Sequence, residues 1–218
     1  MASRRKPERP TIVLLVRHGL TPTTGKILPG RTAGLHLSPE GEAQAEAVAG
    51  RIAEAGGSGP GWPTAVYASP LERTTETARP IARRLGLRVR SERGLIECDF
   101  GSWTGSRLGA LARKPEWQEV QRWPSGFRFP GGESFLQMQA RMVSTLTRLA
   151  RRHPGETIVA VSHADPIKAA VASAAGTHLD LFQRLTVSPC SVTALVYGNT
   201  AHVLTVNSTA SLAQLVPS

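Results

Sequence analysis

Polar side chains stand at the ends of three apolar, strand-like runs of this sequence. They are Arg17 and His18 after the first run, Arg73 shortly after the second and His163 after the third. Guanidinium groups make paired, charge-assisted hydrogen bonds to phosphate oxygens, and a neutral imidazole is a competent nucleophile near pH 7. Ligands of open α/β sheets bind outside the carboxyl ends of the strands. These four residues therefore predict phosphate chemistry at one rim of a sheet.

Taken singly, each of these features also has an ordinary structural interpretation. Arg17 and His18 could end a strand with their side chains in solvent, and His163 could cap a helix or fill a core. Their convergence on one rim favours a site, and Glu97, in the loop-rich segment 95–105, adds a candidate carboxylate. A helix beginning after His163 would contribute amide donors and the positive end of its dipole.

Apolar runs alternate with helix-start signals along the chain, and these elements must position the candidate residues. Strands are predicted at 12–16, 64–68, 87–90, 157–161, 192–197 and 201–206. Helices are predicted to begin at Ser38–Pro39, at Ser69–Pro70 and after Gly131–Gly132–Glu133, with two short helices between 95 and 130. This alternation predicts an α/β fold of three layers, α/β/α, around a mostly parallel sheet. The last two runs flank a short hairpin-like connection and predict an antiparallel edge strand.

Three of the expected helices carry more specific predictions. Ser69 and Glu72 form the Ser-x-x-Glu pattern of a capping box, which would open a helix ending near Leu85. Asp165 followed by Pro166 is typical of an N-cap and the first helical residue, although an aspartate beside a phosphate pocket would repel the ligand. The long helix presents an apolar stripe that predicts core packing: Phe135, Met138, Met142, Leu146 and Leu149.

Length and composition favour a single large domain with a basic surface. The chain has 218 residues, enough for one sizeable core, and no Pro- or Ser-rich linker divides it. We expect a flexible basic tail over 1–10, one domain over 11–218, and a surface loop at the glycine cluster 56–61. Lys and Arg number 26 against 16 Asp and Glu. Because the tail accounts for only part of this excess, the body itself predicts an anionic partner.

Several partner classes are disfavoured. The arginines are scattered along expected helices without a nucleic-acid-binding motif, and aromatic residues are only 5% of the chain, so we expect no nucleic acid partner. No apolar stretch reaches membrane-spanning length, so we expect no membrane association. Cys98 and Cys190 lie far apart and predict thiols in a reducing, cytoplasmic setting. A free strand edge could support a homodimer, which the sequence leaves open.

Six ordered blocks of the chain resemble the histidine phosphatase superfamily, also called phosphoglycerate mutase-like. The first block, LLVRHGLTP, carries the family's Arg-His-Gly signature. The others follow in family order: LSPEGEAQA, VYASPLERTTETA, LIECDFGSWTG, FPGGESF and AVSHADPIKA. The resemblance extends over nearly the whole chain and implies a phosphoglycerate mutase-like fold.

The resemblance also implies a role for each matched residue. His18 would be the nucleophile that becomes a phosphohistidine, and Arg17, Arg73 and His163 would form the phosphate pocket with it. Glu97 would be the general acid and then the base, with the neighbouring Asp99 as a rival. Substrate-binding contacts are expected from five positions: Arg17, Thr24, Arg31, Arg73 and His163. Thr24 stands where many family members have asparagine, which puts the substrate contacts in doubt more than the nucleophile.

The resulting expectation is a metal-independent phosphomonoester hydrolase acting on a small phosphorylated metabolite. No cofactor is expected, and the six histidines lack metal-ligand spacing. The alternatives are a phosphomutase and a catalytically weak module that binds a phosphorylated ligand. The compact segment between Gly101 and Pro130 leaves little material for a cap that shields an intermediate from water, which favours hydrolysis. Its tryptophans, Trp103, Trp117 and Trp123, are expected to pack rather than to bind substrate.

Overall fold

The chain folds around one six-stranded sheet. The computed structural model describes residues 9–56 and 62–210. The strands are β1 (Thr11–Arg17), β2 (Pro63–Ala68), β3 (Val89–Ser91), β4 (Thr157–Ser162), β5 (Val192–Tyr197) and β6 (Ala201–Ser208), in the order β3-β2-β4-β1-β5-β6. Strand β2 is parallel to both β3 and β4, and β4 is parallel to β1, whereas β5 is antiparallel to both β1 and β6. The predicted mostly parallel sheet with an antiparallel pair at one edge is therefore confirmed.

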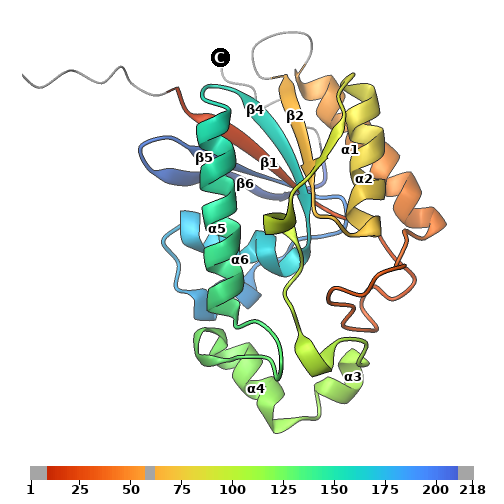
Figure 1. Cartoon of the computed structure of the whole chain (residues 1–218), viewed down its shortest axis with the longest axis vertical. Coiled ribbons are helices and arrows are strands. Elements are labelled where there is room, and N and C mark those ends of the chain that lie inside the picture. The colour runs from red at the N-terminus through yellow and green to blue at the C-terminus, as the bar shows by residue number, and fades with distance from the viewer. Residues whose placement is uncertain (1–8, 57–61, 211–218) are drawn as a thin grey trace, which may run out of the picture.

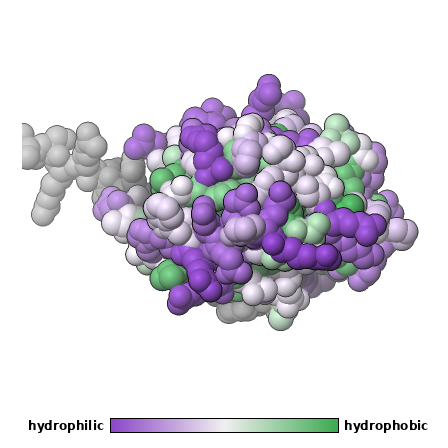
Figure 2. All heavy atoms as spheres, turned by 90° about the horizontal axis from the view of Figure 1, so that it is seen from below, coloured by the Kyte–Doolittle hydropathy of each residue, from purple (hydrophilic) through white to green (hydrophobic). Residues whose placement is uncertain are grey.

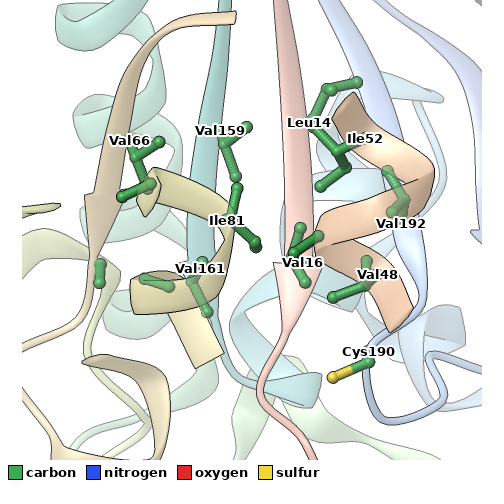
Figure 3. Close-up of a cluster of buried hydrophobic side chains, with 14 of the residues drawn as sticks. Leu14, Val16, Val48, Ile52, Val66, Ile81, Val159, Val161, Cys190 and Val192 are labelled. Atoms are coloured by element: carbon green, nitrogen blue, oxygen red, sulfur yellow. The ribbon is translucent and has the colours of Figure 1, made fainter. Parts of the chain in front are cut away.

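Helices cover both faces of this sheet, as the sequence predicts (Figure 1). Helices α1 (Pro39–Gly56) and α2 (Glu72–Arg84) lie on one face, and α5 (Phe135–Arg152) and α6 (Ala164–Ala174) lie on the other. Figure 3 shows Val48 and Ile52 of α1 facing β1, with Ile81 of α2 facing β4. Residues 12–16 of β1 are all apolar because alternate residues fill the two cores.

The segment between β3 and α5 forms an aromatic layer at the lower end of the molecule in Figure 1. It contains the two predicted short helices, α3 (Leu108–Leu111) and α4 (Pro115–Arg122). Phe129 is central, with edge-on ring contacts to Phe100, Trp103, Phe127 and Phe135 at centroid distances of 4.9–5.5 Å. Trp103 and Trp117 pack in this cluster, whereas Trp123 is 59% exposed.

The predicted helix starts are partly right. Ser38 accepts a hydrogen bond from the Gly41 amide at 3.1 Å, as an N-cap should. The capping box at Ser69 is wrong: α2 begins at Glu72 after Leu71, with no side-chain cap. Asp165 is not an N-cap either, because α6 begins one residue earlier at Ala164, after His163. Relative to the predicted first helical residues, α2 begins two residues after Pro70 and α6 begins two residues before Pro166.

Three further expectations concern the terminal tail and glycine loop, the long helix, and membrane-spanning segments. Residues 1–8 of the expected basic tail and residues 57–61 of the expected glycine loop lie outside the described residues. The apolar stripe of α5 is buried as predicted, so its methionines fill the core. Within residues 9–56 and 62–210, no helix combines the length and apolar character needed to cross a membrane.

Candidate active site

The pairing of β1 with β4 brings the two candidate histidines together. Arg17 is in register with Ser162, so His18 and His163 leave the sheet side by side. The His18 amide donates to the Ser162 carbonyl at 3.0 Å, which continues the ladder by one residue. The two imidazole rings meet edge-on, with centroids 5.2 Å apart. This geometry arises because parallel neighbouring strands end at the same rim of a sheet.

The tautomer of His18 is set by its neighbour. Nδ1 of His18 lies 2.8 Å from the Gly19 carbonyl oxygen. A carbonyl can only accept, so Nδ1 carries the proton and Nε2 keeps its lone pair. Burial, followed by the charge of Arg73, lowers the pKa of His18 to about 3. At neutral pH the ring is therefore uncharged, and Nε2 is available as a nucleophile.

Arg73, which is buried, and Arg17, which is partly buried, lie next to His18 with part of their hydrogen-bonding capacity unused. Nη1 of Arg17 donates to the Val187 carbonyl at 2.7 Å, and Nη2 of Arg73 donates to the Gly30 carbonyl at 2.8 Å. Nε of Arg17 and both Nε and Nη1 of Arg73 have no partner among the described residues. Unpaired buried donors are unfavourable, so these nitrogens favour an anion that supplies acceptor oxygens.

His163 faces the same pocket from the start of α6. Its Nε2 lies 2.9 Å from the Ser69 hydroxyl. Its Nδ1 is buried 3.9 Å from Oε2 of Glu97 and has no hydrogen-bond partner in the part of the chain that the structure describes. Burial and then the charge of Arg73 hold the pKa of His163 well below its usual range. A proton on Nδ1 would therefore be free to bond a ligand oxygen.

Glu97 supplies a carboxyl group suited to carry a proton near neutral pH. Its Oε1 accepts from the Cys98 amide at 2.9 Å. Burial, followed by the negative charge of Asp165, raises the pKa of Glu97 to about 7, against the opposing effects of Arg73 and Arg17. Asp165, expected to cap a helix, instead lies in the first turn of α6 and biases this carboxyl toward its protonated form.

The rival carboxylate Asp99 is engaged elsewhere. Its side chain is 41% exposed, with Oδ2 3.3 Å from Nη1 of Arg31. Its Oδ1 accepts from the Gly101 amide at 3.0 Å, which fixes a turn. Glu97, rather than Asp99, is the carboxylate whose oxygen approaches His163.

The side chains of Thr24 and Arg31 are engaged by protein groups. Oγ1 of Thr24 accepts from the Thr21 amide at 2.9 Å and so caps the turn after His18. Arg31 uses all three of its guanidinium nitrogens on the Glu97 carbonyl, Asp99 and Glu133. Substrate contacts from Thr24 and Arg31 remain predictions.

Two residues with direct contacts in this region escaped the sequence analysis. Ser69, interpreted there as a cap, contacts His163, and its Ser-x-x-Glu pattern concealed that role. Glu133, interpreted there as part of a helix entry, bonds Arg31 and Arg141 beside Glu97. Its only sequence signal is its place in the family-like block FPGGESF.

Known proteins share both sequence and fold with this chain. A bifunctional protein of Mycobacterium tuberculosis is 36% identical over 160 residues, which cover 73% of this chain but only 43% of that relative. A probable phosphoglycerate mutase of Cronobacter sakazakii is 31% identical over 188 residues, covering 85% of this chain and 84% of the relative. The structure of a phosphoserine phosphatase of Entamoeba histolytica, in complex with 3-phosphoglyceric acid, superimposes with a TM-score of 0.80 at 26% identity, covering 91% of this chain and 98% of that one.

A family model provides the assignment that these likenesses suggest. The model described as the histidine phosphatase superfamily (branch 1) matches residues 13–209, which include His18, Arg73, Glu97 and His163. The resemblance inferred from the motifs is thereby confirmed. This chain belongs to the histidine phosphatase superfamily.

Proposed function

We propose that this protein hydrolyses phosphomonoesters of small metabolites through a phosphohistidine at His18. The observation that carries the proposal is the neutral His18 ring, with its Nε2 lone pair free, beside arginine nitrogens that are buried and unpartnered among the described residues. The superfamily assignment and the phosphatase among the relatives support it. Phosphoryl transfer depends mainly on positioning and on stabilising the equatorial oxygens, which this cluster offers.

In the first step, Nε2 of His18 attacks phosphorus and the ester P–O bond breaks. Arg17, Arg73 and Nδ1 of His163 hold the equatorial oxygens. The leaving alkoxide takes the proton of the Glu97 carboxyl, whose raised pKa leaves a large share of it protonated near neutrality. An arriving phosphate dianion raises that pKa further, because a nearby negative charge disfavours a second one. The new imidazolium is stabilised by its Nδ1–H bond to the Gly19 carbonyl.

In the second step, the Glu97 carboxylate takes a proton from water as the water oxygen attacks phosphorus. The P–N bond breaks, Nε2 recovers its lone pair, and inorganic phosphate leaves. Glu97 is then protonated again and ready for the next ester. One carboxyl group thus acts as acid and then as base.

A phosphomutase is the second candidate, because a probable phosphoglycerate mutase matches 85% of this chain. Both reactions share the phosphohistidine and differ in whether water or another hydroxyl accepts the phosphoryl group. The short α3 and α4 leave the aromatic layer compact, and hydrophilic residues cover much of the face that Figure 2 shows. The compact layer leaves little material to shield the phosphohistidine from water, which favours water as the acceptor.

The test is release of phosphate from p-nitrophenyl phosphate and a panel of phosphorylated metabolites, with chelator present. Wild type, His18→Ala and the control His202→Ala, at an exposed histidine of β6, are compared. We expect wild type and His202→Ala to turn over, and His18→Ala to fall to background. Acid-labile phosphate on the wild-type chain alone would identify the intermediate. Turnover by His18→Ala would refute the mechanism, and isomerisation without release would favour the mutase.

A further inference from the structure

Glu133, in the turn before α5, lies at the centre of a polar cluster behind the active site. Its carboxylate accepts from Nη2 of Arg31 and from Nε and Nη2 of Arg141, each at 2.9 Å. It also accepts from the Asp99 amide at 3.1 Å. The Glu133 side chain is only 17% exposed. A carboxylate that accepts this many hydrogen bonds has a fixed position, and it also fixes the positions of the arginines that donate to it.

Both arginines that bind Glu133 also bind the backbone of Glu97. Nε of Arg31 donates to the Glu97 carbonyl at 2.9 Å, and Nη2 of Arg141 approaches the same oxygen at 3.4 Å. Arg141 further donates from Nη1 to the carbonyls of Gly94 and Ile96, at 2.9 and 2.8 Å. The segment that carries Glu97 is therefore fastened by two guanidinium groups.

Glu133 is what allows two positive groups to share one carbonyl oxygen. Without its charge, Arg31 and Arg141 would repel each other in a partly buried setting, where screening by water is weak. Burial acts to raise the pKa of Glu133, but the hydrogen bonds and charge of Arg141 outweigh it and hold the pKa below its usual range. Glu133 is thus ionised across the neutral range, and its negative charge offsets the repulsion between Arg31 and Arg141.

The position of the Glu97 carboxyl group depends on this backbone support. Within residues 9–56 and 62–210, that carboxylate accepts one hydrogen bond, from the amide of Cys98. One bond leaves the carboxyl free to move if its main chain shifts. Arg31 differs here from Arg17 and Arg73, because its nitrogens are all committed to protein oxygens rather than open to an anion.

We propose that Glu133, through Arg31 and Arg141, is a positioning residue that aims the Glu97 carboxyl at the leaving group. The inference rests on the proposed function, since it assumes that Glu97 is the general acid. Neither Glu133 nor its two arginines need touch the substrate for this role. A displaced acid slows reactions that need a proton and spares those that do not.

The test compares kcat/KM for an ester that needs the acid and one that does not. Glycerol 2-phosphate releases a poorly stabilised alkoxide, whereas p-nitrophenyl phosphate releases a stable phenolate. Because kcat/KM covers steps only up to the first irreversible transfer, the later role of Glu97 as base does not enter. We expect Glu133→Gln to lower kcat/KM for glycerol 2-phosphate by about tenfold or more and to change that for p-nitrophenyl phosphate by less than about twofold.

Two further variants keep the test decisive. Arg141→Lys retains the charge but cannot reach all of its acceptors, and it should reproduce the bias even if Glu133→Gln folds poorly. Glu92→Gln is the matched control: Glu92 also pairs with an α5 arginine, Arg148, at 2.8 Å and accepts the Gly94 amide at 3.0 Å, but it does not contact Glu97. Its ratio of the two kcat/KM values should match wild type.

The outcomes separate this inference from the proposed function. Glu97→Gln, run alongside, must itself discriminate against glycerol 2-phosphate; if it does not, the general-acid assignment fails and the inference with it. If Glu97→Gln discriminates but Glu133→Gln and Arg141→Lys lower both activities equally, or neither, the positioning role alone is overturned. A selective loss in either variant, absent from Glu92→Gln, supports it.

Discussion

Burial acts in opposite directions on the proton affinities of His18 and Glu97. It disfavours the charged form of each, so the pKa of the imidazole falls to about 3 and the pKa of the carboxyl rises to about 7. In the free protein at neutral pH, His18 is therefore uncharged and about half of the Glu97 carboxyl population is protonated. An uncharged nucleophile and a protonated acid are the forms that the first step of the proposed reaction requires.

The raised pKa of Glu97 predicts the pH dependence of activity. The ratio of kcat/KM for glycerol 2-phosphate to that for p-nitrophenyl phosphate should fall as pH rises through about 7, because Glu97 loses its proton. Steady-state assays from pH 5 to pH 9 measure this ratio, and Glu97→Gln should flatten it. A wild-type ratio that stays constant across pH 7 would contradict the assignment.

The same shift predicts how stability depends on pH. A carboxyl whose pKa is raised in the folded state contributes stability below its ordinary pKa of 4.5 and loses that contribution as pH rises through about 7. The free energy of unfolding of Glu97→Gln should therefore rise relative to that of wild type between pH 4.5 and pH 7, because only wild type loses stability over this range. Urea titrations at several pH values measure the difference, and parallel curves would refute it.

Ser69 offers a test of how His163 is oriented. Its hydroxyl meets Nε2 of His163 at 2.9 Å and can fix the proton on Nδ1, toward the pocket. Ser69→Ala should remove a hydrogen bond that contributes about 1 kcal/mol to the orientation of His163. This corresponds to about a fivefold loss of kcat/KM for both esters. Thr75→Ala, which removes a hydroxyl bonded to the Leu71 carbonyl in the same region, is the control. Equal activity of Ser69→Ala and wild type would show that the contact is dispensable.

At the scale of elements, the loop after β1 is held against the first turn of α1. A Cβ atom on Gly41 would lie 2.0 Å from the Leu20 carbonyl oxygen, and one on Gly19 would lie 2.5 Å from the Gly41 carbonyl oxygen. Two backbones thus pass each other with no room for side chains. This approach fixes the turn whose Gly19 carbonyl selects the tautomer of His18.

This close approach predicts opposite effects for two glycines of the same helix. Gly41→Ala should destabilise the protein by about 2 kcal/mol or more, because backbone must move, and should lower activity by shifting Gly19. Gly50→Ala should stabilise it by about 1 kcal/mol, since a Cβ there meets nothing within 4 Å among the described residues. Denaturant unfolding measures both. Equal stability of the two variants would contradict the packing of this loop.

At the scale of the whole molecule, the basic charge and the buried arginines predict that anions stabilise the fold. The formal net charge is +10, and the unused guanidinium nitrogens lie at one rim of the sheet. Charge of this size attracts anions in general, whereas the rim offers a defined pocket. A site-specific effect must therefore be separated from a general one.

Inorganic phosphate should raise the melting temperature through that pocket. At ten times its dissociation constant it adds about 1.4 kcal/mol to the unfolding free energy. Thermal melts at constant ionic strength should show the rise in wild type and in Arg84→Gln, at an exposed arginine of α2, but not in Arg17→Gln. A rise of equal size in Arg17→Gln would indicate general charge neutralisation instead.

The alternation of apolar runs and helix-start signals was enough to predict the layers of this fold and its antiparallel edge. Each buried strand reads as a continuous apolar run because both of its faces are covered, and polar residues at its end must then lie at the rim. For this reason the sequence by itself placed Arg17, His18, Arg73 and His163 near one another. The family-like blocks added the superfamily and a predicted role for Glu97.

Only the tertiary structure decided what these residues do to one another. The proton on Nδ1 of His18, the raised pKa of Glu97 and the commitment of Arg31 all arise from groups brought close by folding. Ser69 and Asp165 carry valid local capping signals, yet Ser69 bonds a histidine 94 residues away and Asp165 lies inside its helix. Local patterns record the conformational preferences of neighbours in the chain, whereas proton affinity and hydrogen-bond choice depend on neighbours in space.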